Sequence, residues 1–167
     1  MKYLAAAAVL FPAAILQVTL APRLEVAGAF PNLVLLAVVG WTLVRGAASG
    51  LRWAIAGGLL LDLVAPGPLG VHALALAVAA YGVGFLQRSF EPDPWLLPGA
   101  SGALAAVAYN LVLVALSDLL GHPISILPVL QAWIAPAALY QAALTPLALL
   151  VLRRLDRALP RPVVIDW

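Results

Sequence analysis

Apolar residues fill the chain in long runs, separated by short stretches of glycine, proline, arginine or acidic residues. A helix needs roughly 20 apolar residues to cross the hydrocarbon core of a membrane. The pattern therefore predicts membrane-spanning helices over residues 3–21, 31–44, 51–64, 69–86, 95–119 and 126–152. The predicted fold class is all-α, a polytopic membrane protein with about six transmembrane helices in one compact bundle. Because a second span follows directly, the first is expected to remain in the protein and not to be cleaved as a signal peptide.

Composition supports a membrane location. The chain has 167 residues, of which 9 are basic and 7 acidic, and its mean hydropathy is +1.07. Charged residues make up 10% of the chain, whereas soluble domains carry about 25%. A water-exposed surface needs more charge than this, so a soluble enzyme, a disordered chain and a nucleic-acid-binding protein are excluded. Cysteine is absent, and we expect neither a disulfide nor a thiolate metal site.

The basic residues predict the orientation of the bundle. With a cytoplasmic N-terminus, all but Arg23 fall on the cytoplasmic side of the six predicted spans. These residues are Lys2, Arg45, Arg52, Arg88, Arg153, Arg154, Arg157 and Arg161. Such an asymmetry predicts that both termini are cytoplasmic. Residues 153–167 are predicted to form a basic cytoplasmic tail near anionic lipid, because two prolines break any continuing helix.

Four tryptophans occur where aromatic rings of membrane interfaces are expected. Trp41 and Trp53 flank the turn between the second and third spans, Trp95 begins the fifth span, and Trp167 lies in the tail. Indole rings favour the headgroup level of a bilayer. We therefore expect these four side chains to mark the edges of the membrane.

Small residues recur at every fourth position around the third predicted span. Gly46, Gly50, Ala54 and Gly58 form this small-residue row, and Asp62 stands at its next position. Residues four apart share one face of a helix, and small side chains allow close helix approach in lipid. The row is predicted to pack either against a helix of the same chain or against a helix of another protein.

Asp62 is the most conspicuous ionisable residue within a predicted span. Such residues are functional-site candidates, but Asp62 lies near the outer end of its helix. The fourth helix is predicted to begin at Leu69 or Gly70, and its free backbone N–H groups are expected to receive the Asp62 carboxylate. His72, one turn further, is expected to add a charged or neutral partner. A contact with another protein, and a ligand or proton site, are the alternatives.

Polar residues suited to chemistry are otherwise few. The remaining ones within spans are Gln17, Asn110, Asp118 and Gln141. His72 and His122 lie on different outer loops without the spacing of a metal site, and none of the five serines has an evident base beside it. We therefore predict no catalytic residue, no cofactor and no metal site. A transport path needs several polar groups at the membrane midplane, and only Gln17, Asn110 and Gln141 qualify.

Two motifs resemble the MreD family of rod shape-determining proteins. The first is GGLLLDL, over residues 57–63, and the second is PLGVHAL, over residues 68–74. The stretches PNLVLL (31–36) and LQVT (16–19), the turn at Arg45-Gly46 and the arginine-terminated last helix are also similar to that family. The resemblance covers nearly the whole chain and is most specific over residues 31–84.

The resemblance implies a non-enzymatic subunit of the elongation complex in the bacterial inner membrane, which builds sidewall peptidoglycan and maintains rod shape. The implied direct partner is MreC, a single-span protein with a periplasmic domain. RodA, its class B penicillin-binding transpeptidase and the MreB cytoskeleton form the wider complex. The candidates for packing against a partner are Gly46, Gly50, Ala54, Gly58, Asp62, Gly70 and His72.

The resemblance also implies a fold similar to the S components of energy-coupling-factor transporters, which are six-helix bundles. This likeness implies an alternative function, in which the chain binds a vitamin at its outer face and docks to a transporter. The short, apolar outer loops weigh against a vitamin pocket.

Overall fold

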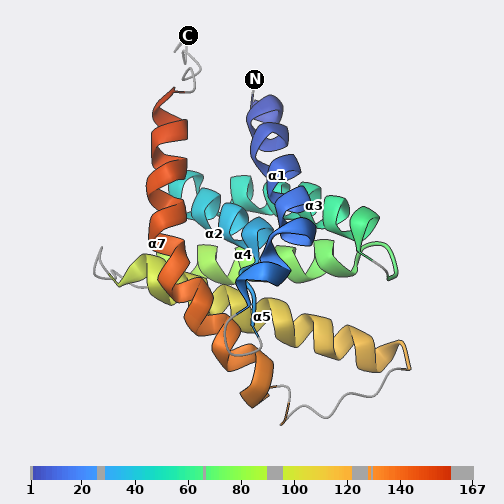
Figure 1. Cartoon of the computed structure of the whole chain (residues 1–167). Coiled ribbons are helices and arrows are strands. Elements are labelled where there is room, and N and C mark those ends of the chain that lie inside the picture. The colour runs from blue at the N-terminus through green and yellow to red at the C-terminus, as the bar shows by residue number, and fades with distance from the viewer. Residues whose placement is uncertain are drawn as a thin grey trace.

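The computed structural model describes residues 2–25, 29–65, 67–89, 96–121, 128 and 130–158, and this part of the chain is helical (Figure 1). Its α-helices are α1 (Lys2–Thr19), α2 (Leu33–Arg45), α3 (Ala47–Val64), α4 (Val71–Ser89), α5 (Leu97–Leu119) and α7 (Ala135–Ala158). A 3₁₀ helix, η1 (Ala21–Leu24), follows α1, and a π-helical turn, η2 (Leu130–Ile134), leads into α7. The all-α prediction is confirmed for these residues.

Helix α2 forms the centre of the bundle. Every residue from Val34 to Thr42 is buried, so the helix is covered on all sides. Its sequence is apolar almost all round, which is typical of a helix enclosed by others. Helices α1, α3, α4, α5 and α7 all contact it.

The outer helices pack as neighbours in chain order. Helix α3 lies along α4, α4 along α5, and α5 along α7. In Figure 1, α3, α4 and α5 run across the molecule, whereas α1 and α7 run steeply on either side of α2. The start of α1 and the end of α7 both point to the top of this view.

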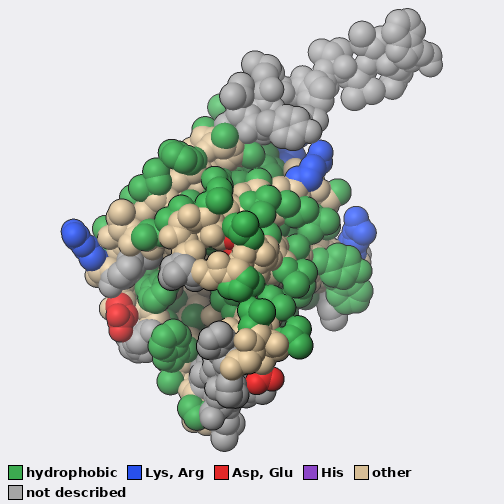
Figure 2. Space-filling view, turned by 90° about the vertical axis from the view of Figure 1, so that its right-hand side faces the viewer, with side chains coloured by type: hydrophobic (Ala, Val, Ile, Leu, Met, Phe, Trp, Pro, Cys, Tyr) green, Lys and Arg blue, Asp and Glu red, His purple; other side chains and the backbone are tan. Residues whose placement is uncertain are grey.

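Apolar side chains cover much of the outside of the bundle. Phe11, Tyr81, Phe85 and Leu139 are 58%, 69%, 61% and 74% exposed. Figure 2 shows a face on which hydrophobic side chains predominate and charged ones are scattered. Such a surface is a liability in water but suits contact with hydrocarbon.

Four helical segments are long and apolar enough to cross a membrane. They are Ala47–Val64, Val71–Ser89, Leu97–Leu119 and Gln131–Ala158. The apolar helices Ala6–Thr19 and Leu33–Arg45 are shorter. The chain is therefore a helical bundle with the length and surface of a multi-pass membrane protein.

Two helix boundaries differ clearly from the prediction. Helix α3 begins at Ala47 and not at residue 51, so Gly50 lies inside it. Helix α7 continues to Ala158, past the predicted end at residue 152. Arg153, Arg154 and Arg157, in the predicted basic tail, therefore lie on this helix. The remainder of the predicted tail, residues 159–167, lies outside the described residues.

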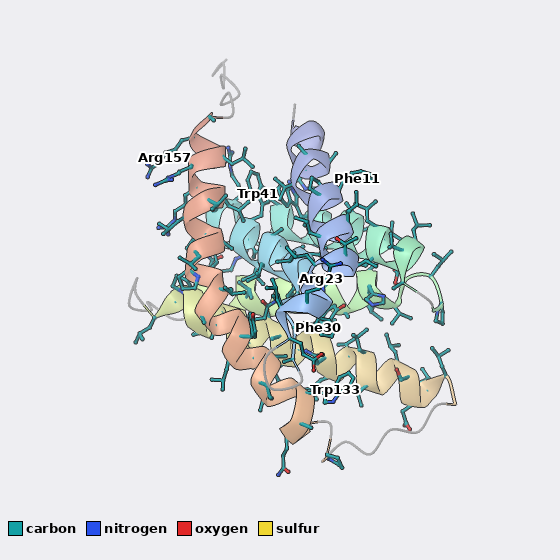
Figure 3. The ribbon with its side chains drawn as sticks, viewed as in Figure 1. Phe11, Arg23, Phe30, Trp41, Trp133 and Arg157 are labelled. Carbon is teal, nitrogen blue, oxygen red and sulfur yellow. The ribbon has the colours of Figure 1, made fainter. Side chains whose placement is uncertain are left out.

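Trp41 and Trp53 are core residues, and the prediction that they face the membrane interface was wrong. They are 5% and 4% exposed, and their rings stack with centroids 4.2 Å apart and planes 12° apart. The Trp41 Nε1–H donates to Ser49 Oγ at 3.0 Å. Figure 3 labels Trp41 in the upper half of the bundle. The short turn between α2 and α3 brings the two rings together, and stacking is favourable for aromatic pairs. Trp95 and Trp167 lie outside the described residues.

Candidate functional site

The Asp62 carboxylate ties the end of α3 to the start of α4. Its side chain is fully buried. Oδ2 accepts from the backbone N–H of Gly70 at 2.8 Å and of Ala73 at 3.4 Å, and Oδ1 accepts from the His72 N–H at 2.9 Å. The His72 Nδ1 lies 2.8 Å from Oδ1 and donates to it when the carboxylate is ionised, since an ionised carboxylate only accepts. We call these four residues the Asp62 clamp.

The local sequence explains the geometry of the Asp62 clamp. Gly70 has a φ of +97°, a conformation that glycine adopts without strain, and it turns the chain into α4 directly beside Asp62. The first N–H groups of a helix lack partners within it, and the positive end of the helix dipole favours a carboxylate there. The hydrogen bonds predicted from the sequence are therefore present.

A cavity of about 220 Å³ lies beside the Asp62 clamp, between the α3–α4 connection and the last turns of α5. It is lined by Asp62, Ala65, Gly67, Pro68, Val71, His72, Leu113, Ser117 and Leu120. The Tyr109 ring of α5, which is buried, lies 6.3 Å from the His72 ring. The part of the chain that the structure describes holds no group of three metal-ligating side chains.

Most of the small-residue row packs inside the chain. A Cβ built on Gly58 would overlap the backbone of Ala73 in α4, and one built on Gly50 would overlap the Thr42 side chain of α2. Ala54 is fully buried. This arrangement favours packing within the chain over docking of another protein. A role for these residues in binding a partner stays a prediction.

Gly46 departs from the predicted row, because it lies in the turn between α2 and α3. Its φ of +82° is a conformation that glycine adopts without strain, and its N–H donates to Thr42 O at 2.8 Å. The neighbouring Arg45 donates through Nε to Asp156 of α7. This ion pair, which sequence analysis missed, ties the turn to the last turns of α7. The two residues are 111 positions apart, so no local signal reveals the contact.

Polar side chains from three helices meet at the start of α2. Gln17 Oε1 of α1 accepts from the Leu33 N–H at 2.6 Å, and Asn32 Oδ1 caps the helix by accepting from the Leu35 N–H at 2.9 Å. Gln141 Nε2 of α7 donates to Asn32 O at 3.0 Å. Gln17 and Gln141 thus each bind a backbone group at the start of α2. Sequence analysis missed Asn32, although asparagine before an apolar run is a common helix N-cap.

The other polar candidates take no part in these two sites. Asn110 Nδ2 donates to Ala106 O, one turn back in α5. Asp118 is exposed near the end of the same helix. His122 lies outside the described residues.

The fold and these contacts define a class: helical membrane bundles in which buried polar side chains, here Asp62 and Gln141, bind backbone groups at the starts of helices. Comparison with protein families matches residues 2–155 to the rod shape-determining protein MreD. The chain belongs to the MreD family and is therefore a rod shape-determining membrane protein. Members of this family are structural proteins that determine cell shape, and the family is not a known family of enzymes. No curated protein and no solved structure matches the chain.

Proposed function

We propose that the chain is a non-enzymatic scaffold of the bacterial elongation complex in the inner membrane. In this role it binds MreC and supports sidewall peptidoglycan synthesis together with RodA, its class B penicillin-binding transpeptidase and MreB. The family match over residues 2–155 carries the proposal. The structure supports it, because the buried clamp and the capped start of α2 build a fixed bundle suited to holding a partner.

The proposed topology has six spans with both termini in the cytoplasm. Helix α2, with 13 residues, is about 20 Å long at 1.5 Å per residue, which is short for a span. Pro31 before it is buried, and irregular backbone is tolerated at membrane depth where protein surrounds it. The start of α1 and the end of α7 point the same way in Figure 1, which also supports termini on one side.

Labelling of single cysteines tests this topology, and the chain suits it because it has no cysteine of its own. Arg23→Cys and Leu120→Cys are expected to react with a membrane-impermeant maleimide in intact spheroplasts. Ser89→Cys and Arg157→Cys are expected to react only after the membrane is permeabilised. Labelling of Ser89→Cys in intact spheroplasts would contradict the six-span arrangement.

We infer that the Asp62 clamp sets the outer end of the α3–α4 pair, where a periplasmic partner of the bundle emerges. Asp62→Ala and Gly58→Leu are therefore expected to reduce co-purification of MreC. Matched controls are Asp118→Ala, an exposed acid of α5, and Gly82→Leu, where an added Cβ meets open space. Gel filtration selects variants that stay folded. Unchanged recovery of MreC with both Asp62→Ala and Gly58→Leu would refute the role of the clamp and of the packing.

One observation favours the alternative function, an S component of a vitamin transporter. The cavity beside the Asp62 clamp carries the polar side chains of Asp62, His72 and Ser117 in an otherwise apolar wall. The test is mass spectrometry of small molecules released from the protein purified alone. A vitamin at one equivalent per chain supports the transporter, and its absence together with MreC binding supports the scaffold.

A further inference from the structure

The cavity beside the Asp62 clamp has the size of a single aromatic ring system. Its volume is about 220 Å³. In Figure 1 the connection between α3 and α4 and the end of α5, which enclose the cavity, lie on the right of the bundle. Pockets for drug-sized ligands measure about 300–1,000 Å³, whereas a cavity of about 150 Å³ already holds benzene. The volume therefore matches one side chain better than a whole vitamin.

The Asp62 carboxylate is not free to bind an occupant of this cavity. Each of its two oxygens already accepts two hydrogen bonds, from the backbone N–H groups of Gly70, His72 and Ala73 and from His72 Nδ1. An ionised carboxylate has about four lone-pair positions, so all of them are occupied. In the described lining, Asp62 is the only carboxylate, and lysine and arginine are absent. The cavity therefore suits an occupant without net charge.

His72 brings a hydrogen-bond acceptor to the cavity wall. Because the Nδ1–H donates to Asp62, the neutral imidazole carries its lone pair on Nε2. No hydrogen bond within the described residues involves this nitrogen, and the His72 side chain is partly exposed and lines the cavity. The Ser117 hydroxyl, which also lines it, is able both to donate and to accept. The polar part of the wall is thus matched by a neutral O–H or N–H donor.

We propose that the cavity binds a tyrosine or tryptophan side chain of a partner at the outer face of the membrane, whose O–H or N–H donates to His72 Nε2. These side chains combine an apolar ring with one polar tip, and they are frequent anchors of protein interfaces. An acyl chain would leave His72 Nε2 without a donor, and a lysine or arginine would find no free carboxylate. The proposal rests on the proposed topology, which puts the Asp62 clamp at the outer face, and it does not require that the partner is MreC.

Nuclear magnetic resonance of the full chain in detergent tests the hydrogen bond, because the chain has only two histidines, His72 and His122. Carbon and nitrogen isotopes are introduced in histidine alone, and a spectrum of His122→Gln assigns the His72 signals. The probes are 4-methylphenol, which reproduces the tyrosine side chain, and toluene, which has the same ring without the donor. One hydrogen bond contributes about three- to tenfold in affinity, and 4-methylphenol is expected to bind more tightly than toluene by this factor. Both probes are expected to shift the His72 Cε1–H signal through their ring current, but only 4-methylphenol the Nε2 resonance.

A pair of variants in α5 tests the location of the binding site. Ser117→Phe places a ring in the cavity wall and is expected to abolish saturable binding of both probes. Ala115→Phe, at an exposed position outside the lining, is expected to leave binding unchanged. Circular dichroism checks that each variant is folded. The absence of a saturable shift with 4-methylphenol, equal affinity for the two probes in the wild type, or unchanged binding in Ser117→Phe would each overturn the proposal.

Photo-crosslinking in native membranes identifies the occupant. Benzoylphenylalanine replaces Leu120, which lines the cavity and is 50% exposed. The crosslinked partner peptide is expected to contain a tyrosine or tryptophan, and alanine in its place is expected to lower the crosslinking yield at least about tenfold. Adducts with phospholipid alone, or with peptides that lack both residues, would overturn the proposal. An aromatic peptide from a protein other than MreC would support it, and co-purification of MreC then tests the scaffold function separately.

Discussion

Replacement of Asp62 by alanine is expected to destabilise the bundle strongly. The carboxylate is the acceptor for three backbone N–H groups at the start of α4 and for the His72 ring. Alanine leaves those N–H groups without their side-chain partner. Because the first N–H groups of a helix have no acceptor within it, α4 itself does not compensate for the loss.

The magnitude follows from the geometry of the individual contacts. A hydrogen bond to a charged group contributes about 1.5–3 kcal/mol, and an unsatisfied buried donor costs about 1–3 kcal/mol. The Ala73 contact is long at 3.4 Å, and the His72 side chain is 24% exposed and can turn toward solvent. The two short backbone contacts, from Gly70 and His72, therefore dominate, and the expected loss is about 3–5 kcal/mol. Asp62→Asn keeps one acceptor oxygen and is expected to lose about 1–3 kcal/mol.

The assay is titration of the purified protein in mild detergent with dodecyl sulfate, with helicity followed by circular dichroism. Asp118→Ala removes an acid from an exposed position of α5 and is expected to change stability by less than about 0.5 kcal/mol. If Asp62→Ala and Asp118→Ala unfold at the same dodecyl sulfate fraction, the Asp62 clamp does not stabilise the bundle and the reasoning is wrong.

Two further pairs of variants are measured in the same titration. Gly58→Ala is expected to cost about 1–3 kcal/mol because its Cβ would overlap the α4 backbone, whereas Gly82→Ala faces open space and is expected to be neutral or to gain up to about 1 kcal/mol. Equal losses in both would contradict close α3–α4 packing. Gln17→Leu leaves the Leu33 N–H without its side-chain acceptor and is expected to cost about 1–3 kcal/mol. Gln141→Leu removes the hydrogen bond to Asn32 O, but it also removes Oε1, a buried oxygen that has no partner in the described residues. Because these two effects oppose each other, the expected loss of stability is less than about 1 kcal/mol. A larger loss for Gln141→Leu would contradict this account of the start of α2.

The Asp62 clamp was predictable because its members are close in the chain. The longest separation is the 11 residues between Asp62 and Ala73, and a tight turn of glycine and proline joins them. A carboxylate that ends one helix beside the start of the next has few alternatives for its hydrogen bonds. The location of most helices was predictable for a related reason, since a chain in hydrocarbon satisfies its backbone within each helix.

The start of α2 and the Arg45–Asp156 pair were not predictable in this way. Gln141 reaches Asn32 across 109 residues, and Arg45 reaches Asp156 across 111. Which helix lies beside which depends on the whole arrangement of the bundle. The prolines at 160 and 162 predict only that no helix continues past them; the structure shows that α7 extends to Ala158, beyond the predicted span.

The amino-acid pattern alone was enough for the all-α class, the membrane location, the family and the α3–α4 clamp. Only the tertiary structure established that α2 is the central helix, that Trp41 and Trp53 stack in the core, and that a cavity lies between the α3–α4 connection and the last turns of α5. The physical reason for this division is the solvent around the helices. In water, burial separates apolar from polar residues, but in lipid apolar side chains face both the protein interior and the acyl chains. Hydrophobicity therefore predicts where the membrane helices lie, and only packing decides which of their faces meet.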